Sequence, residues 1–419
     1  MFGNVSRSRL LPMSLPFRYF GAAVAFHAAA WGVLLVSWKE LLSFEAGLGP
    51  VFGSLHLLTL GVLAMTAIGA TLQLLPVATR QPVRARWAVK LVWWLLVPGV
   101  LVFSCGAALY RPALMGPGAT VVLAALALYS VLLLKNLAGA RGMRLVVAHG
   151  WAALACLVAL AATGLALVGG YEHGWALDHV ALRNAHLILA TFGFMGLLSF
   201  GLSSFLLPML AVAPPPAARA TKGILGAGLT AILLGASGFV LPAALLGLAA
   251  AIGHVVAMER SLRARLRQPL GASFLLVRIS WGCLIASLAL AALMALEIAP
   301  PRAPLLFGLL LVPGWLLTFL LGVLQRIVPF LASVHASSSP RGTPVISALT
   351  PVRLLAVHRS LHVVALSFLI AAAFAGQAWL ALIGAAAGLA GALAFAAFFA
   401  FVLMKVHHGI QPPHQPAPA

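Results

Sequence analysis

Charged side chains are scarce in this sequence of 419 residues, and acidic ones are the rarest. Only 8% of the residues are charged and six are Asp or Glu, whereas 63% are hydrophobic. A water-soluble domain of this size cannot bury so large an apolar fraction. The composition therefore excludes a soluble globular protein and indicates an all-α, multi-pass membrane protein whose first partner is the lipid bilayer.

Cysteine is also rare. The three cysteines, Cys105, Cys156 and Cys283, lie far apart in apolar runs. This spacing excludes a disulfide framework and a CxxC metal or redox site. Any bound metal would have to use histidine, of which the chain has 13.

The net charge of +20 comes from 26 basic residues that are dispersed between apolar segments. Because they form no single patch, nucleic-acid binding is excluded as the main function. Residues 1–16 are basic and lack a signal-peptide pattern, so we expect a cytoplasmic tail there. We expect a single membrane domain over 17–410 and a disordered, Pro-rich tail over 411–419.

Twelve apolar segments are long enough to cross a bilayer as helices. They are 17–38, 50–78, 87–110, 112–135, 143–170, 179–211, 222–241, 242–258, 272–296, 303–333, 352–376 and 378–405. With the N-terminus inside, only Lys39, Arg111, Arg183 and Arg302 of the basic residues fall outside, and Glu259 is the only acid inside. By the positive-inside bias, both termini are expected in the cytoplasm, in a membrane of the bacterial inner (plasma) type.

A pattern Gly-x7-Gly-x6-Pro recurs three times and nowhere else in the chain. Its glycines and prolines are Gly61, Gly69, Pro76; Gly193, Gly201, Pro208; and Gly314, Gly322, Pro329. Chance predicts about 0.2 such matches, so a fixed-period match of this kind indicates an internal repeat. The copies lie four spans apart and predict three four-helix units, near 17–135, 143–258 and 272–405. Paired glycines two turns apart let another helix approach closely, so we expect the three helices that carry them to be inner helices.

Several histidines fall within the expected spans, where an ionisable side chain is costly unless it is paired, hydrated or ligating. By depth, His56 and His186, with His27 as a third candidate, form an outer set, and His149, His358 and His362 form an inner set. Neutral imidazole is a good ligand for haem iron and for copper, and facing helices can present two of them. We therefore take all six as candidate cofactor ligands, and His56, His186, His358 and His362 as candidate metal ligands. A hydrogen bond to a neighbouring helix is the alternative for each.

The segment HLLTLGVLAMTAIGATLQLLPV at 56–77 and its echo HLILATFGFMGLLSFGLSSFLLPM at 186–209 resemble the haem-copper oxidase subunit I superfamily. The resemblance includes its divergent non-oxidase relatives, such as the NnrS-like proteins linked to nitric oxide metabolism. It implies twelve helices in three four-helix arcs. It also implies that His56 occupies the position of a low-spin haem ligand and that His186 lies in the helix that keeps one copper ligand.

Two departures from that family limit the activity that the resemblance implies. The segment 222–241 has none of the copper-binding histidines expected in helix 7, and 303–333 lacks the His-x-His pair expected in helix 10. An oxygen-reducing centre cannot be assembled, so the chain is not expected to be a terminal oxidase.

The sequence thus predicts a haem b or copper protein in electron transfer or nitric-oxide-linked respiratory metabolism, with a redox partner or respiratory subunit. Whether it is an enzyme stays open. A metal or small-molecule transporter remains an alternative, although known transporter repeats are usually twofold. A cofactor-free assembly or sensor subunit is the other.

Overall fold

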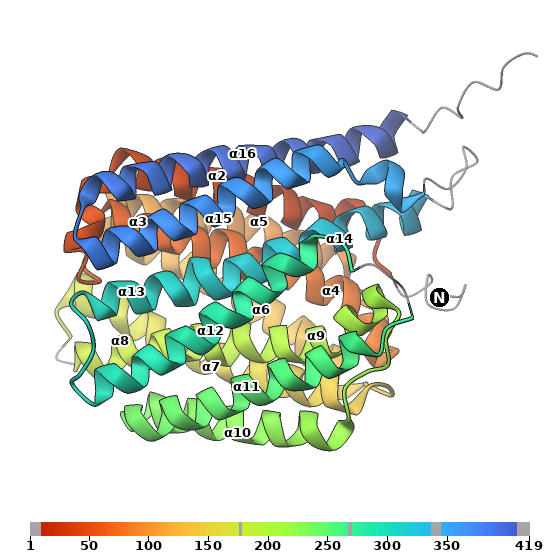
Figure 1. The fold of residues 1–419 in the computed structure, drawn as a ribbon, viewed down its shortest axis with the longest axis horizontal. Coiled ribbons are helices and arrows are strands. Elements are labelled where there is room, and N and C mark those ends of the chain that lie inside the picture. The colour runs from red at the N-terminus through yellow and green to blue at the C-terminus, as the bar shows by residue number, and fades with distance from the viewer. Residues whose placement is uncertain (1–9, 176–177, 267–269, 337–344, 409–419) are drawn as a thin grey trace, which may run out of the picture.

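The computed structural model describes residues 10–175, 178–266, 270–336 and 345–408, and within these ranges it contains helices and no strand. The long helices lie side by side along one axis (Figure 1). Nine of them are unbroken α-helices: α2 (Ser14–Val36), α5 (Arg86–Ala108), α6 (Pro112–Ala138), α7 (Arg144–His173), α10 (Ala218–Ala236), α11 (Val240–Arg263), α12 (Ser273–Ala295), α15 (Val352–Ala375) and α16 (Ala378–His408). Two short 3-10 helices, η1 (Trp38–Ser43) and η5 (Ile346–Leu349), lie between them.

Three further long helices are composite, because each changes from α to π geometry and back. They are α3 (Pro50–His56), η2 (Leu57–Ala64) and α4 (Met65–Thr79); α8 (His179–Ile188), η3 (Leu189–Gly196) and α9 (Leu197–Ala211); and α13 (Ala303–Leu309), η4 (Leu310–Leu317) and α14 (Thr318–Ala336). The segments η2, η3 and η4 are the π-helices. Such segments are rare and usually a single turn long, and they are frequent at functional sites.

Eleven helices of the described chain are long and apolar enough to cross a membrane, one fewer than the sequence predicted. The expected span at 222–241 corresponds to α10, which is not among the eleven. Arg219 and Lys222 lie in the first turns of α10 and lower its hydropathy. The other expected spans each match one helix to within a few residues.

Each π segment has the same position relative to the glycine-proline pattern. Each is eight residues long, and its fifth residue is the first glycine of the pattern: Gly61, Gly193 or Gly314. The π segments are also in contact, since η4 packs against both η2 and η3. The composite helices are therefore the inner helices of the bundle, as the paired glycines predicted.

At each pair of pattern glycines, the helix that precedes the composite helix in the chain packs closely against it. A Cβ atom on the first glycines would lie 2.6 to 3.1 Å from Phe26, Cys156 and Cys283, and one on the second glycines 2.6 to 3.1 Å from Tyr19, His149 and Leu276. In all three cases the two partners are seven residues apart. Only glycine permits this approach without moving the neighbour, because real Cβ contacts are longer.

The outer helices pack in a pattern that also occurs three times. The hairpins α5–α6, α10–α11 and α15–α16 each pack on the composite helix that precedes them in the chain. Helices α6, α11 and α16 pack against α7, α12 and α2 respectively. The last of these contacts joins the C-terminal helix to the N-terminal one, so the first and third sets of helices are also neighbours.

The structure describes the expected N-terminal tail from residue 10 onward. Helix α2 begins at Ser14, Leu11 is buried, and the Leu11 N–H donates to Gln73 Oε1 at 3.1 Å. These residues pack on the bundle because Leu11 and Leu15 find apolar surface there. The expected C-terminal tail over 411–419 lies outside the described residues.

Candidate functional site

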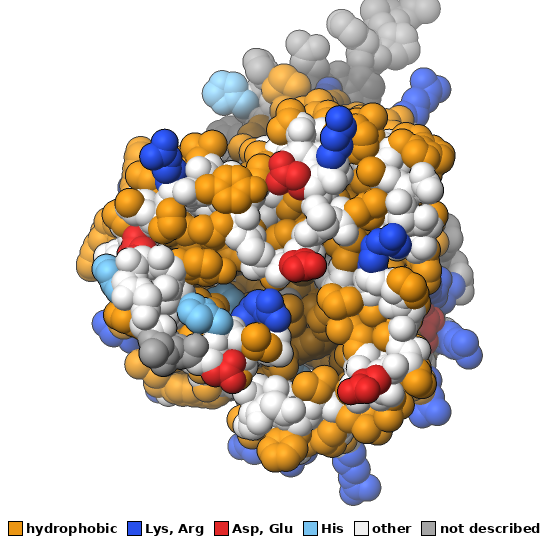
Figure 2. Space-filling view, turned by 90° about the vertical axis from the view of Figure 1, so that its left-hand side faces the viewer, with side chains coloured by type: hydrophobic (Ala, Val, Ile, Leu, Met, Phe, Trp, Pro, Cys, Tyr) orange, Lys and Arg blue, Asp and Glu red, His pale blue; other side chains and the backbone are white. Residues whose placement is uncertain are grey.

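A large cavity lies among the composite helices and opens at the end of the bundle where α3, α8 and α13 begin. Its volume is about 1330 Å³, larger than the 300–1,000 Å³ typical of a small-molecule site. Most of its walls are apolar, and the polar groups include His56, His149, His186 and Thr191. Figure 2 views the open end and shows a hollow with charged side chains around it. The chain therefore holds a deep apolar chamber with a few nitrogen and oxygen groups in its wall.

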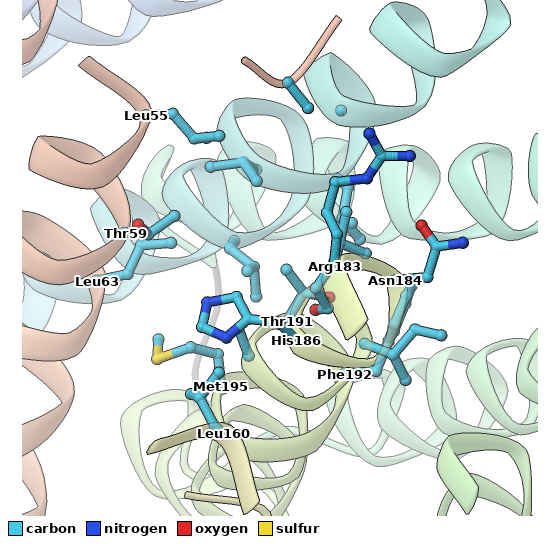
Figure 3. Close-up of a pocket in the computed structure, with 18 of the residues that line it drawn as sticks. Leu55, Thr59, Leu63, Leu160, Arg183, Asn184, His186, Thr191, Phe192 and Met195 are labelled. Atoms are coloured by element: carbon cyan, nitrogen blue, oxygen red, sulfur yellow. The ribbon is translucent and has the colours of Figure 1, made fainter. Parts of the chain in front are cut away.

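His186 reaches this cavity from α8, and Figure 3 shows its ring within the pocket. Its Nδ1 lies 3.2 Å from the Thr163 hydroxyl, which itself donates to the Leu160 carbonyl at 2.9 Å. Because the hydroxyl proton is already used, the hydrogen-bond network assigns the proton of His186 to Nδ1. Its Nε2 therefore carries a lone pair.

His56 shows the same arrangement on the facing composite helix. Its Nδ1 donates to the Phe52 carbonyl at 3.1 Å, and its ring lies between the rings of Phe52 and Phe103, at centroid distances of 4.3 and 5.0 Å. The proton on Nδ1 leaves a lone pair on Nε2. His56 and His186 are close enough to interact electrostatically. Both histidines that the sequence placed in the outer set therefore line the same cavity.

His149 also lines the cavity but belongs to a second pair. Its Nδ1 donates to the Leu145 carbonyl at 2.8 Å, and its electrostatic neighbour is His254 on α11. His254 is stacked on Phe200 at 3.9 Å and donates from Nε2 to the Ser203 hydroxyl at 3.3 Å. Ser203 donates its own proton to the Phe200 carbonyl, so His254 Nε2 must be the donor in the bond to Ser203.

The other three candidates form a separate cluster away from the cavity lining. His27 interacts electrostatically with His358 and His362, whose rings are 6.0 Å apart. The sequence expectation had divided these residues between an outer set and an inner set. The structure replaces that division with three groups: His56 with His186, His149 with His254, and His27 with His358 and His362.

Comparison with known proteins does not identify this chain. No family model matches it, and no curated protein matches it. The resemblance to the haem-copper oxidases stays a prediction, and the geometry of the cavity must carry the functional argument.

Within the described residues, no group of three or more His, Cys, Asp or Glu side chains is arranged to hold a metal ion. A metal bound here would therefore take one or two histidines from the protein and further ligands from elsewhere. A haem needs only such axial ligands, because its porphyrin supplies the other four nitrogens. The cavity pair fits this requirement better than it fits a closed structural metal site.

Sequence reasoning missed several parts of this site. Thr163 is an ordinary mid-helix residue in the sequence, and its role depends on its contact with His186 across two helices. His254, the neighbour of His149, was not among the six candidate histidines. The signal for His254 was present, since a histidine 15 residues into an apolar helix carries the same cost as the six candidates.

The helix that carries His186 is held at its start by an Asp178 cap. The Asp178 carboxylate accepts from the backbone N–H groups of Val180 and Ala181, at 3.1 and 3.0 Å. We expect Asp178→Ala to destabilise the first turn of α8 by about 1 kcal/mol. Hydrogen exchange should show faster exchange of these two amides while α9 keeps its protection. Unchanged exchange at both amides would show that the cap does not hold α8.

Proposed function

We propose that this chain is a membrane redox protein that binds haem b or copper through His56 and His186 in the apolar cavity. The observation that carries the proposal is the state of these two rings. Both donate from Nδ1 and both leave the Nε2 lone pair available. Histidine ligands usually donate their other ring nitrogen in this way, which fixes the tautomer and orients the ring.

The cavity around the pair supports the same proposal. Its walls come from all three composite helices and offer mainly apolar surface, which a macrocycle can fill while water is kept out. When bound, the iron or copper would supply a one-electron step. His56 and His186 would hold it, the Phe52 carbonyl and the Thr163 hydroxyl would orient them, and the apolar wall would exclude water.

We also propose that the fold is a threefold repeat of four-helix units, with α10 as the seventh helix of twelve. The support lies in three π segments in one register, three pairs of equivalent glycine contacts and three equivalent outer packings. Three such units are also what the resemblance to the haem-copper oxidase superfamily implies. A twofold transporter repeat does not produce these equivalences.

The resemblance further suggests a place in electron transfer or nitric-oxide-linked respiratory metabolism, beside a redox partner or respiratory subunit. The proposed location is a bacterial-type inner membrane with both termini in the cytoplasm. In that orientation the cavity opens to the outside, at the end where Glu45, Arg183 and Arg302 contribute to its lining. Electron exchange with a partner would then take place near that end.

Two other functions remain as alternatives. The open mouth of the cavity favours a small-molecule transporter, because a transported molecule needs an opening through which to enter. A cofactor-free assembly or sensor subunit would use the same bundle without a bound metal. Neither explains why both cavity histidines present Nε2.

An optical spectrum of the purified, dithionite-reduced protein tests the proposal. A haem b protein gives a sharp α band, and a copper protein without haem gives copper by elemental analysis and an electron paramagnetic resonance signal when oxidised. A colourless, metal-free protein would refute the redox proposal and leave the transporter and cofactor-free functions. Proteoliposome flux then separates those two.

The hydrogen bond behind His186 gives a second test. Thr163→Val keeps the shape of the side chain and removes the oxygen that orients His186, so cofactor affinity should fall by about 10- to 100-fold. Thr230→Val is the matched control, because the Thr230 hydroxyl bonds only to a carbonyl of its own helix on the exposed side of α10. Equal cofactor content in the two variants would exclude a role for Thr163.

A further inference from the structure

The cluster of His27, His358 and His362 contains polar atoms that have no hydrogen-bond partner. The three side chains are 2%, 0% and 2% exposed. Among the described residues, His27 Nδ1 and His358 Nε2 are buried and unpartnered. Leaving such groups unpaired inside an apolar bundle is costly, so a ligand for them is expected.

The surrounding hydrogen bonds assign the tautomer of each ring. His27 Nε2 accepts from the Trp31 indole N–H at 3.0 Å, so His27 carries its proton on Nδ1. His358 Nδ1 donates to the Gly391 carbonyl at 2.9 Å, so its Nε2 carries a lone pair. The unpartnered atoms are thus one donor and one acceptor.

The third ring adds a second acceptor. His362 Nε2 lies 2.7 Å from the Thr318 hydroxyl, and Thr318 donates its proton to the Pro313 carbonyl at 2.7 Å. His362 must therefore donate from Nε2, which leaves its lone pair on Nδ1. The cluster as a whole offers one N–H donor and two nitrogen acceptors.

The donor and the first acceptor are brought together on one face of α16. Trp31, which holds His27, packs on Gly388, and His358 bonds to the carbonyl of Gly391 three residues later. Each of the three rings comes from α2 or α15, and α16 packs against both helices.

We propose that this cluster is a binding site for a single internal water molecule inside the membrane-embedded bundle. The water accepts from His27 Nδ1, donates to His358 Nε2 and directs its second proton toward His362 Nδ1. A buried water typically makes about three hydrogen bonds to polar groups that lack other partners. This inference does not rest on the proposed redox function, since it uses none of the cavity histidines.

Water fits the cluster better than a metal ion does. A metal ion needs lone pairs that converge, whereas His27 presents an N–H group. The cluster is also not among groups of ligands arranged for a metal within the described chain. Water matches both the donor and the acceptors without any change of tautomer.

A polar contact leads from this site toward the end of the bundle where α14 finishes. Arg359, next to His358 in α15, donates to Gln325 Oε1 on α14 at 3.2 Å. The Gln325 Nε2 group is buried and has no partner among the described residues. Gln325 thus offers a further buried donor beside the half-buried Arg359.

Nuclear magnetic resonance of the full chain, labelled with ¹⁵N-histidine in lipid nanodiscs, tests the proposal. We expect His27 and His358 to be protonated on Nδ1, and His27 Hδ1 to show a cross-peak to bound water. His358→Leu should abolish that cross-peak. His358→Gln should keep it, because an amide can donate to Gly391 and accept from the water. His173→Gln, an exposed change in the last turn of α7, is the control.

The wild-type protein alone can overturn the proposal, whether or not the leucine variant folds. Protonation of either ring on Nε2, or a missing water cross-peak in a spectrum that resolves His27 Hδ1, would do so. Stoichiometric copper or zinc that is lost from His358→Gln and retained by His56→Ala would instead identify a metal site. Loss of cofactor from the cavity variants would leave this inference untouched.

Discussion

His56→Ala and His186→Ala are each expected to lower the haem or copper content per chain by at least about tenfold. Each substitution removes an imidazole whose Nε2 lone pair is available. No neighbouring Asp, Glu or Cys is arranged with the pair to replace it within the described residues. The α band or copper signal of the purified variant measures the effect.

His173→Ala is the matched control for both variants. His173 lies at the exposed end of α7 and pairs only weakly with Glu172, at 3.9 Å. It should retain the cofactor content of the wild type. If His56→Ala and His186→Ala retain it too, while folded and purified alike, then the cavity pair does not bind the cofactor. Loss from only one variant would reduce the site to a single axial histidine.

Gly201→Leu is expected to destabilise the bundle by about 3 kcal/mol or more, because it overpacks a contact that has no free space. A Cβ at Gly201 would lie 2.6 Å from His149 Cβ, which cannot move without α7. Gly61→Leu should behave alike, since its Cβ would lie 2.8 Å from Phe26 Cβ. Thermal unfolding in detergent and the yield of monodisperse protein measure the loss.

Gly226→Leu on α10 separates overpacking from any general effect of adding a leucine. Nothing lies within 4 Å of a Cβ at Gly226, and leucine favours a helix more than glycine does. The variant should therefore be as stable as the wild type or more so. Equal instability of Gly226→Leu and Gly201→Leu would contradict the account of close packing at the pattern glycines.

The sequence was informative about which helices lie inside. The glycine-proline pattern identified the three composite helices, because a glycine pair two turns apart has a packing consequence that does not depend on the rest of the fold. The π geometry of η2, η3 and η4 could not be read in the same way. No residue type specifies it, since the Leu and Gly that occur in all three π segments also occur in the α-helical parts of the same helices.

The grouping of the histidines was only partly predictable. Distance along a span gives depth in the bilayer, and on that basis His56 was grouped with His186; both line one cavity. It does not give the direction in which a helix faces. His27 lies with His358 and His362 because α16 packs against both α2 and α15. The contact between α16 and α2 joins the two ends of the chain, and no local pattern specifies it.

The tautomers of the cavity rings were likewise beyond sequence reasoning. His56 and His149 donate to the carbonyl four residues earlier, which a helical histidine can do without any partner helix. His186 instead depends on Thr163 of α7. A motif search finds the histidine and misses the residue that orients it.

The ligands of the bound metal give the most direct test of the central claim. Electron paramagnetic resonance of the oxidised protein, with ¹⁵N incorporated only in histidine, reports nitrogen coupling from the groups that bind iron or copper. We predict coupling from two imidazole nitrogens in the wild type, and coupling from one in the residual metal that His186→Ala retains. A protein that holds no iron or copper, or a metal signal that His186→Ala and His56→Ala both leave unchanged, would contradict the account.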